Sequence, residues 1–360
     1  MGNNSRIIGF DLARAYAIFG MYIVNFNMVF GSYDSTSLAG KFLSLFSGNS
    51  STVFVMLAGM GIALMTNRPY YTAEEKKKLR HTVLKRAWFL CVLGLLLSIW
   101  WPADILHFYG VYLFIASFLL FLHKRYYLIA SLVSILVFHI LLFIIPFEKG
   151  WNFDTLAYTG LWTITGFIRN TFYNGWNSVF PWIAYFTTGM YLGRLNWTLL
   201  ITQKRVFLLG TLLFLPVTTL QICAQNIFTN KELLDIITAD YLPPLLPFLL
   251  STIGFGLMLI AGFMYSSTFF TASKFVQNLA KTGQMTLTHY IAHLTIGMII
   301  FSLISGKTYA AKVNETDPVH PLWILAFAIV YFVISYYFSK TWTAKYKNGP
   351  LETLMRRLST

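Results

Sequence analysis

Acidic residues and cysteines are scarce in this chain of 360 residues. It holds 13 Asp and Glu against 27 Lys and Arg, and all charged residues together make up only 11% of it. Soluble domains carry about 25% charged residues, so this composition excludes an ordinary soluble protein. The two cysteines, Cys91 and Cys223, fall inside apolar segments. There they are better suited to packing than to a disulfide.

Long apolar runs fill most of the chain instead. Hydrophobic residues make up 56% of it and the mean hydropathy is +0.61. Runs of about 20 residues can cross a hydrocarbon core of about 30 Å. They lie near residues 7–29, 43–66, 84–101, 105–122, 126–147, 177–195, 206–228, 243–266, 284–305 and 321–339. We therefore predict an all-α polytopic membrane protein with about ten transmembrane helices, forming a single domain over residues 1–360.

Two of the segments between these runs are polar. Residues 66–86 are basic and amphipathic, and we expect their central part, 67–83, to be a short loop at the membrane surface. Residues 151–175 are interrupted by Asn, Gly and Arg169, which predicts an interfacial or re-entrant segment. We find no clear repeat between the two halves, and this weakens a transporter interpretation.

The basic residues orient the chain. Ten crossings place both termini on one side, and most Lys and Arg, including the clusters at 76–86 and 340–357, fall on that side. The positive-inside rule makes this side cytoplasmic. A basic cytoplasmic rim explains the net charge of +14 without a nucleic-acid partner.

The first apolar run carries polar side chains at two levels. Asp11 and Arg14 share a helix face near the cytoplasmic end. They either form an ion pair that anchors the helix, or Arg14 meets an anionic group such as a phosphate. Asn25 and Asn27 follow about 21 Å beyond Asp11, at 1.5 Å per residue. Either amide can lie at an interface, and Asn25 is the better candidate for a polar pocket.

The stretch WWPADILHFYG, residues 100–110, places Asp104 and His107 three residues apart on one helix face. In one interpretation Asp104 caps the helix and His107 is interfacial. In the other, the carboxylate orients the imidazole as a general base.

The stretch TLTHYIAHL, residues 286–294, places His289 and His293 on one face of an apolar helix. Ionisable groups inside a membrane are functional candidates by default, although at least one of these histidines suits a hydrogen-bonded core position. We predict no metal site, because no third ligand lies near them in sequence.

Together these stretches resemble the YeiB-like family of bacterial membrane proteins, which is related to heparan-alpha-glucosaminide N-acetyltransferase and the transmembrane acyltransferase superfamily. The resemblance rests on R-x4-D-x2-R at Arg6, Asp11 and Arg14, followed by Val24 and Asn25. It continues with ADILHFYG at 103–110, NGWNSVFPWIAYFTTGMYLGRL at 174–195, GQMTLTHYIAH at 283–293 and GPLETLMRRLS at 349–359.

The resemblance implies an acetyltransferase of the bacterial cytoplasmic (inner) membrane. An acetyl group would pass from cytoplasmic acetyl-CoA to a hydroxyl or amine of a sugar-like acceptor on the outer side. In the acetyltransferase relatives an Asn ends the first shared helix, as Asn25 does here, and a histidine in the next external loop is the base. Residues 26–66 of this chain contain no histidine, so His107 and His293 become the candidates for the base.

In this interpretation His107, oriented by Asp104, removes the acceptor proton, while Asn25 and His293 stabilise the oxyanion and His289 is a further candidate. Arg14, Arg86 and Arg194 would hold coenzyme A phosphates, with Asp11 beside Arg14. The alternative is a transporter or exporter of a polar or lipid-linked metabolite. A homodimer is left open.

Overall fold

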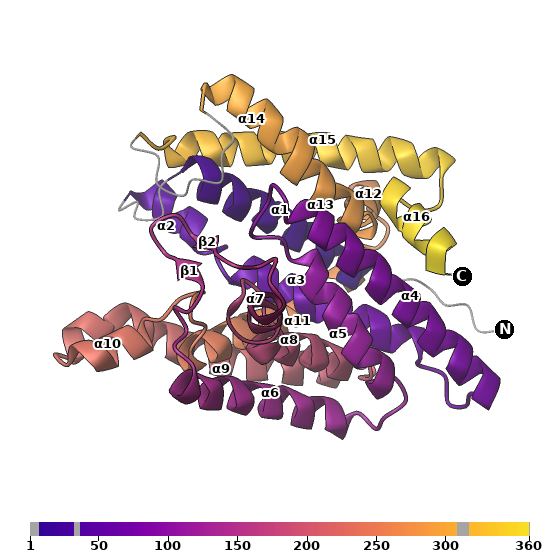
Figure 1. Ribbon diagram of the computed structural model, residues 1–360. Coiled ribbons are helices and arrows are strands. Elements are labelled where there is room, and N and C mark those ends of the chain that lie inside the picture. The colour runs from indigo at the N-terminus through magenta and orange to yellow at the C-terminus, as the bar shows by residue number, and fades with distance from the viewer. Residues whose placement is uncertain (1–6, 32–36, 308–316, 360) are drawn as a thin grey trace.

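The structure, a computed structural model, describes residues 7–31, 37–307 and 317–359. Arg6, the first residue of the R-x4-D-x2-R motif, lies outside this range. The described chain is mainly helical, as the apolar runs predict (Figure 1). Its first half comprises α1 Ile8–Phe30, α2 Leu38–Ser44, α3 Asn49–Met65, α4 Ala73–Leu97, α5 Leu106–Leu119, α6 Arg125–Ile144, β1 Trp151–Asn152, β2 Ala157–Tyr158, α7 Ile164–Arg169 and the π-helix η1 Asn170–Asn174.

Every element of the described second half is a helix. It comprises α8 Val179–Leu192, α9 Leu200–Ile227, α10 Lys231–Ile237, α11 Leu246–Phe270, α12 Lys274–Gln284, α13 Thr286–Ala292, the π-helix η2 His293–Gly297, α14 Met298–Ser305, α15 Pro321–Lys345 and α16 Pro350–Ser359. Figure 1 shows α14 and α15 on one side of the bundle and α6 and α9 on the opposite side.

Six helical stretches of the described chain are long and apolar enough to cross a membrane. They are Leu38–Met65, Arg125–Ile144, Leu200–Ile227, Leu246–Phe270, Thr286–Ser305 and Pro321–Lys345. The other predicted runs also fall on helices, but α5 and α8 have only 14 residues each, short of the roughly 17 that a spanning helix needs. The number of ten crossings and the cytoplasmic termini therefore stay predictions.

The outer helices present apolar side chains where a soluble protein would be polar. On α6, Leu132 and Leu136 are 68% and 60% exposed, and on α9, Leu208 and Leu212 are 59% and 61% exposed. Exposed apolar surface on this scale marks contact with lipid or with another protein. In a chain with this composition, lipid is the simplest neighbour for these faces.

Helices α3 and α8 pack with their backbones in contact. A Cβ atom placed on Gly59 of α3 would lie 1.9 Å from the carbonyl oxygen of Phe186, and one on Gly189 of α8 would lie 1.9 Å from that of Met56. Both glycines are therefore required for this close approach. Small residues at helix contacts are typical of membrane proteins, in which packing and not water exclusion holds helices together.

The first helix, α1, lies in the interior of the bundle. It contacts α3, α11, α12, α13 and α15, and most of its side chains, including Asp11, are buried. A helix that carries charged and amide groups is thus surrounded by protein on several sides. This arrangement places the polar groups of α1 where they can contact residues from distant parts of the chain.

The basic segment 67–83 is not a loop over its whole length. Helix α4 begins at Ala73, because the hydroxyl of Thr72 accepts the Glu75 N–H at 3.2 Å and the Glu75 carboxylate accepts the Thr72 N–H at 2.9 Å. This reciprocal capping box satisfies two backbone donors at the helix start. Residues 73–83 of this segment form the first turns of α4, and its place at the membrane surface stays a prediction.

Residues 151–175 form no spanning helix. The segment contains the antiparallel pair β1 and β2, followed by α7 and η1. Whether it lies at a membrane surface stays a prediction. The cysteines Cys91, on α4, and Cys223, on α9, are both free and half-buried, as their positions inside apolar helices predict.

Candidate functional site

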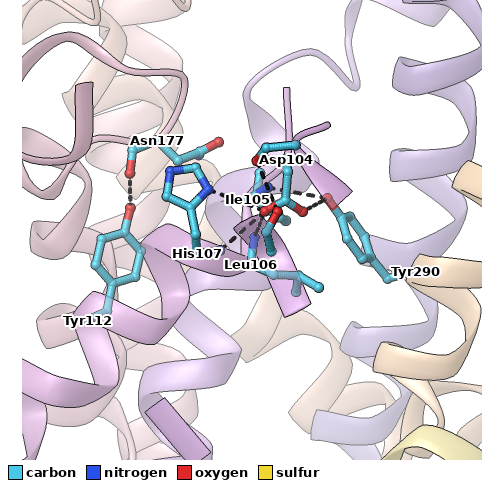
Figure 2. Close-up of polar contacts among 9 residues, drawn as sticks. Asp104, Ile105, Leu106, His107, Tyr112, Asn177 and Tyr290 are labelled. Atoms are coloured by element: carbon cyan, nitrogen blue, oxygen red, sulfur yellow. Dashed lines mark hydrogen bonds and ion pairs between the residues drawn. The ribbon is translucent and has the colours of Figure 1, made fainter. Parts of the chain in front are cut away.

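Asp104 both caps α5 and orients His107. Its Oδ2 accepts the backbone N–H groups of Leu106 at 2.9 Å and His107 at 3.2 Å, and lies 3.3 Å from His107 Nδ1 (Figure 2). Capping by Asp104 and its contact with the imidazole are therefore compatible, because both use the same oxygen, whereas the buried His107 does not fit the interfacial interpretation. Since Nδ1 donates to a carboxylate, the neutral ring keeps a free lone pair on Nε2. That Nε2 is buried and has no hydrogen-bond partner in the described part of the chain.

A glycine of α4 makes room for this pair. A Cβ atom on Gly94 would lie 2.5 Å from Asp104 Oδ2 and 2.1 Å from the His107 backbone nitrogen. No side chain can therefore replace Gly94 without displacing the start of α5. Asp104 is 0% exposed and His107 is 2% exposed, so both groups are removed from bulk water.

Tyr290 of α13 binds the other oxygen of the same carboxylate. Its hydroxyl donates to Asp104 Oδ1 at 3.3 Å and accepts the Ile105 N–H at 3.3 Å. Figure 2 shows His107 and Tyr290 on opposite sides of Asp104. The sequence gives no signal for Tyr290, although it lies between His289 and His293, because an aromatic residue in an apolar helix is usually part of the core.

His293 supports the side chain of Asn25. Its Nδ1 lies 3.2 Å from the carbonyl oxygen of His289, which can only accept, so Nδ1 carries the proton and Nε2 accepts. The amide Nδ2 of Asn25 donates to this Nε2 at 2.8 Å. The imidazole is 0% exposed and lies against the Tyr22 ring, with centroids 5.0 Å apart. Asn25 is therefore held in one orientation by a neutral histidine.

His289 has a separate set of contacts. Its Nε2 lies 2.7 Å from the hydroxyl of Ser339, which itself donates to the Ser335 carbonyl. Because that hydroxyl proton is already used, His289 Nε2 donates. The two histidine side chains therefore point to different partners although they share a helix face. His289 fits the core interpretation.

Two cavities approach each other near these residues. The first, which we call the arginine cavity, has a volume of about 190 Å³ and is bordered by Arg14 and Arg86, with apolar walls that include Leu57 and Leu113. The second, the asparagine cavity, has a volume of about 240 Å³ and is bordered by Asn25, Asn177, Asp240, Tyr241 and Trp176. Tyr290 borders both of them. Neither His107 nor His293 borders either one.

The two arginines of the arginine cavity differ in their partners. Arg14 Nη1 lies 3.0 Å from Asp11 Oδ1, and its side chain is 26% exposed. The other Asp11 oxygen accepts from Gln284 Nε2 at 2.9 Å. Asp11 thus pairs with Arg14 within α1, joins α1 to α12 through Gln284, and does not border the cavity. Arg86 donates to Ser359 Oγ at 3.4 Å, and no described carboxylate lies within ion-pair distance of it, so its charge is available to a ligand.

Arg194 lies apart from Arg14 and Arg86. Its guanidinium donates to the hydroxyl of Thr66 and to the carbonyl oxygen of Leu120, both at 2.7 Å. It borders a different cavity. Arg194 thus binds the C-terminal ends of α3 and α5. It does not border the arginine cavity. In residues 7–31, 37–307 and 317–359, no group of three His, Cys, Asp or Glu residues could hold a metal ion.

Comparison with known proteins matches two family models to the chain. The model described as heparan-alpha-glucosaminide N-acetyltransferase, catalytic, covers residues 6–222, and that of the protein family of unknown function DUF418 covers residues 198–360. No curated protein and no solved structure matches the chain. Asn25 and Asp104 lie in the first match and Tyr290 and His293 in the second, so the site combines both. Because the first match covers more than half of the chain, this protein belongs to the heparan-alpha-glucosaminide N-acetyltransferase catalytic family.

Proposed function

We propose that this protein is a membrane-bound acetyltransferase that moves an acetyl group from acetyl-CoA to a hydroxyl or amine of a sugar-like acceptor. The observation that carries the proposal is the arginine cavity. It is bordered by the cationic groups of Arg14 and Arg86 and by Tyr290, which is hydrogen-bonded to Asp104. Membership of an acetyltransferase family supports the reaction class.

The donor would occupy the arginine cavity. Arg14 and Arg86 suit phosphate groups, because guanidinium groups form strong charge-assisted hydrogen bonds to phosphate oxygens. The walls between these arginines and Tyr290, including Leu57, Leu90 and Leu113, are apolar. They suit the flexible chain that links the phosphates of coenzyme A to its thioester. The acetyl group would then lie beside Tyr290.

The acceptor would occupy the asparagine cavity, where Asn177, Asp240 and Tyr241 provide hydrogen-bonding groups and Trp176 an aromatic wall. Its oxygen or nitrogen attacks the thioester carbonyl carbon, and the amide of Asn25 donates to the developing oxyanion. His293 keeps that amide oriented. The carbon–sulfur bond then breaks.

The acceptor proton would reach the Asp104–His107 pair through Tyr290. His107 does not border the asparagine cavity, whereas Tyr290 borders it and its hydroxyl donates to Asp104. As Tyr290 accepts the acceptor proton, its own proton passes to the carboxylate, next to His107. The departing coenzyme A thiolate takes up this proton, which leaves the pair as it began. A general base of this kind raises the rate of the chemical step about 10²- to 10⁴-fold.

In the membrane, the predicted topology assigns the arginine cavity to the cytoplasmic side and the asparagine cavity to the outer side. Arg14 and Arg86 lie toward the basic rim, and positive charge gathers on the cytoplasmic side of membrane proteins. The proposal also includes ten membrane crossings of the chain and its location in a bacterial cytoplasmic membrane. With the two cavities on opposite sides of the membrane, a cytoplasmic donor can reach an acceptor outside the cell.

Binding of coenzyme A to the purified protein tests the donor site. We expect coenzyme A to raise the melting temperature, because a ligand that binds only the folded state stabilises it. Arg86→Gln should weaken binding roughly 10- to 100-fold, for a lost charge-assisted bond of about 1.5 to 3 kcal/mol. Arg205→Gln, on the exposed part of α9, is the matched control.

Two results would overturn the proposal. One is a melting temperature of the unaltered protein that does not respond to coenzyme A. The other is the absence of acetyl transfer from labelled acetyl-CoA to glucosamine and to a panel of other amino and hydroxy sugars, while vesicles containing the protein take up the same sugars without any acyl donor. The second result would favour a transporter.

A further inference from the structure

We propose that Tyr290 is a partition between the arginine cavity and the asparagine cavity, held closed by its hydrogen bonds to Asp104 and Ile105. The meaning of this partition rests on the proposed function, since a donor and an acceptor that enter from opposite faces of the membrane must meet beside Tyr290. The ring opens to bring them together, and its hydroxyl returns to Asp104 for the proton transfer. The partition itself is a property of the structure and can be tested separately.

The start of α5 runs along the same boundary as Tyr290. Ile105 borders the asparagine cavity and the next residue, Leu106, borders the arginine cavity. The Tyr290 side chain is 2% exposed, and among the described residues it is the one that borders both cavities. A ring in this position fills the space that would otherwise connect them. Removing it would join the two cavities at the level of Asp104.

The bonds that hold Tyr290 are suited to breaking. Both are 3.3 Å long, whereas O–H···O bonds are commonly about 2.7 to 2.8 Å and N–H···O bonds about 2.9 to 3.0 Å. When the Tyr290 hydroxyl leaves, Asp104 Oδ2 keeps the N–H groups of Leu106 and His107. The carboxylate therefore keeps two of its backbone donors when Tyr290 moves.

The backbone beside Tyr290 changes its helical form. Tyr290 lies on the last full turn of α13, and η2 begins at His293. A π-helical turn holds one more residue than an α-helical turn and is often found at functional sites. A small adjustment of this turn would move Tyr290 away from Ile105. The same turn carries His293, so opening and the orientation of Asn25 are mechanically linked.

Cysteine labelling tests the partition without any assumption about catalysis. In a Cys91→Ala, Cys223→Ala background, Ser47→Cys reports on the asparagine cavity and Ala58→Cys on the arginine cavity. A membrane-impermeant thiol reagent is applied to right-side-out and inside-out vesicles. With Tyr290 intact, we expect each reporter to react from one side only, and the two reporters from opposite sides.

Opening the partition should let the Ser47→Cys reporter react from both sides. Tyr290→Ala should raise the rate from the previously closed side roughly tenfold or more, because an open state that is populated at a few per cent becomes the main state. Tyr290→Phe keeps the ring but loses both hydrogen bonds and should raise that rate less. Tyr109→Ala is the matched control, since Tyr109 borders the arginine cavity but not the asparagine cavity. In this variant the Ser47→Cys reporter should still react from one side only.

Reaction of Ser47→Cys from both sides while Tyr290 is intact would overturn the inference. So would one-sided labelling in both Tyr290 variants, provided that each elutes as a folded protein in size-exclusion chromatography. If the labelling behaves as expected but coenzyme A does not bind, the partition stands and the proposed acetyltransferase activity fails. In an active enzyme, Tyr290→Ala should also raise acceptor-independent hydrolysis of acetyl-CoA relative to transfer.

Discussion

The carboxylate of Glu352, on the C-terminal helix α16, caps the helix that carries Tyr290 by binding Thr288. Glu352 Oε2 accepts the Thr288 hydroxyl at 2.6 Å, while Oε1 accepts the backbone N–H groups of Thr288 at 3.1 Å and Leu287 at 2.8 Å. The first N–H groups of a helix have no partner within that helix. A residue more than 60 positions away in sequence thus completes the start of α13.

Glu352→Ala should therefore destabilise the protein. Three buried donors would lose their acceptor, and hydrogen bonds to a charged group contribute about 1.5 to 3 kcal/mol. We expect a lower melting temperature in detergent and faster amide exchange at residues 286–290. Glu352→Gln, which keeps one acceptor oxygen, should recover part of the loss. Glu232→Ala, at an exposed position on α10, is the control; equal melting temperatures for the two alanine variants would show that the cap is unimportant.

Asn25→Ala should lower kcat with little change in KM. Removing one donor to an oxyanion costs about 10²- to 10³-fold in kcat. Asn27→Ala is the control, because Asn27 borders neither the arginine cavity nor the asparagine cavity.

A double-mutant cycle asks whether His293 acts through Asn25. If it does, combining His293→Phe with Asn25→Ala should cost no more activity than Asn25→Ala alone, because coupled residues are not additive. Additive losses would show that His293 has a role of its own.

The contacts near Asp104 could be predicted because they are local. Capping and the pairing of Asp104 with His107 act over three residues, and helix geometry fixes the distance between such positions. The capping box at Thr72 and Glu75 is local as well, and its pattern was present in the sequence. Giving it full weight would have placed the start of α4 correctly.

The contacts that join distant segments could not be predicted. Asn25 and His293 are 268 positions apart, and no periodicity of one segment specifies which face of another it meets. The same holds for Tyr290 and Asp104, 186 positions apart. Arg194 was grouped with Arg14 because all predicted cytoplasmic ends lie at one level, but a common level does not imply a common cavity. Only the packing of whole helices against one another resolves these questions.

Asp104→Asn separates the structural role of Asp104 from its proposed role in proton transfer. The amide oxygen can still accept the N–H groups of Leu106 and His107, so the melting temperature should change little. Without the carboxylate, however, the acceptor proton has no destination, and kcat should fall about 10²- to 10⁴-fold. Asp235→Asn, exposed on α10, serves as control. Unchanged kcat in Asp104→Asn would limit Asp104 to capping α5.

The capping box at the start of α4 should make the stability of this helix end depend on pH. The Thr72 backbone N–H, assisted by Arg68, lowers the pKa of the Glu75 carboxyl from its usual 4.5. Because the folded-state pKa is the lower one, the stabilisation is complete above the unfolded-state value and is lost as pH falls through the folded-state pKa. Protection of the amides of residues 73–76 against hydrogen exchange, corrected for intrinsic rates, should therefore decrease on acidification.

Glu75→Gln should remove this pH dependence, because a neutral amide does not titrate. Glu74→Gln is the matched control, since the neighbouring Glu74 takes no part in the capping box and its loss should leave the acid-induced decrease in place. If Glu75→Gln and the unaltered protein lose amide protection equally on acidification, the decrease arises from another group. The capping box would then fix the first turn of α4 through the Thr72 hydroxyl alone.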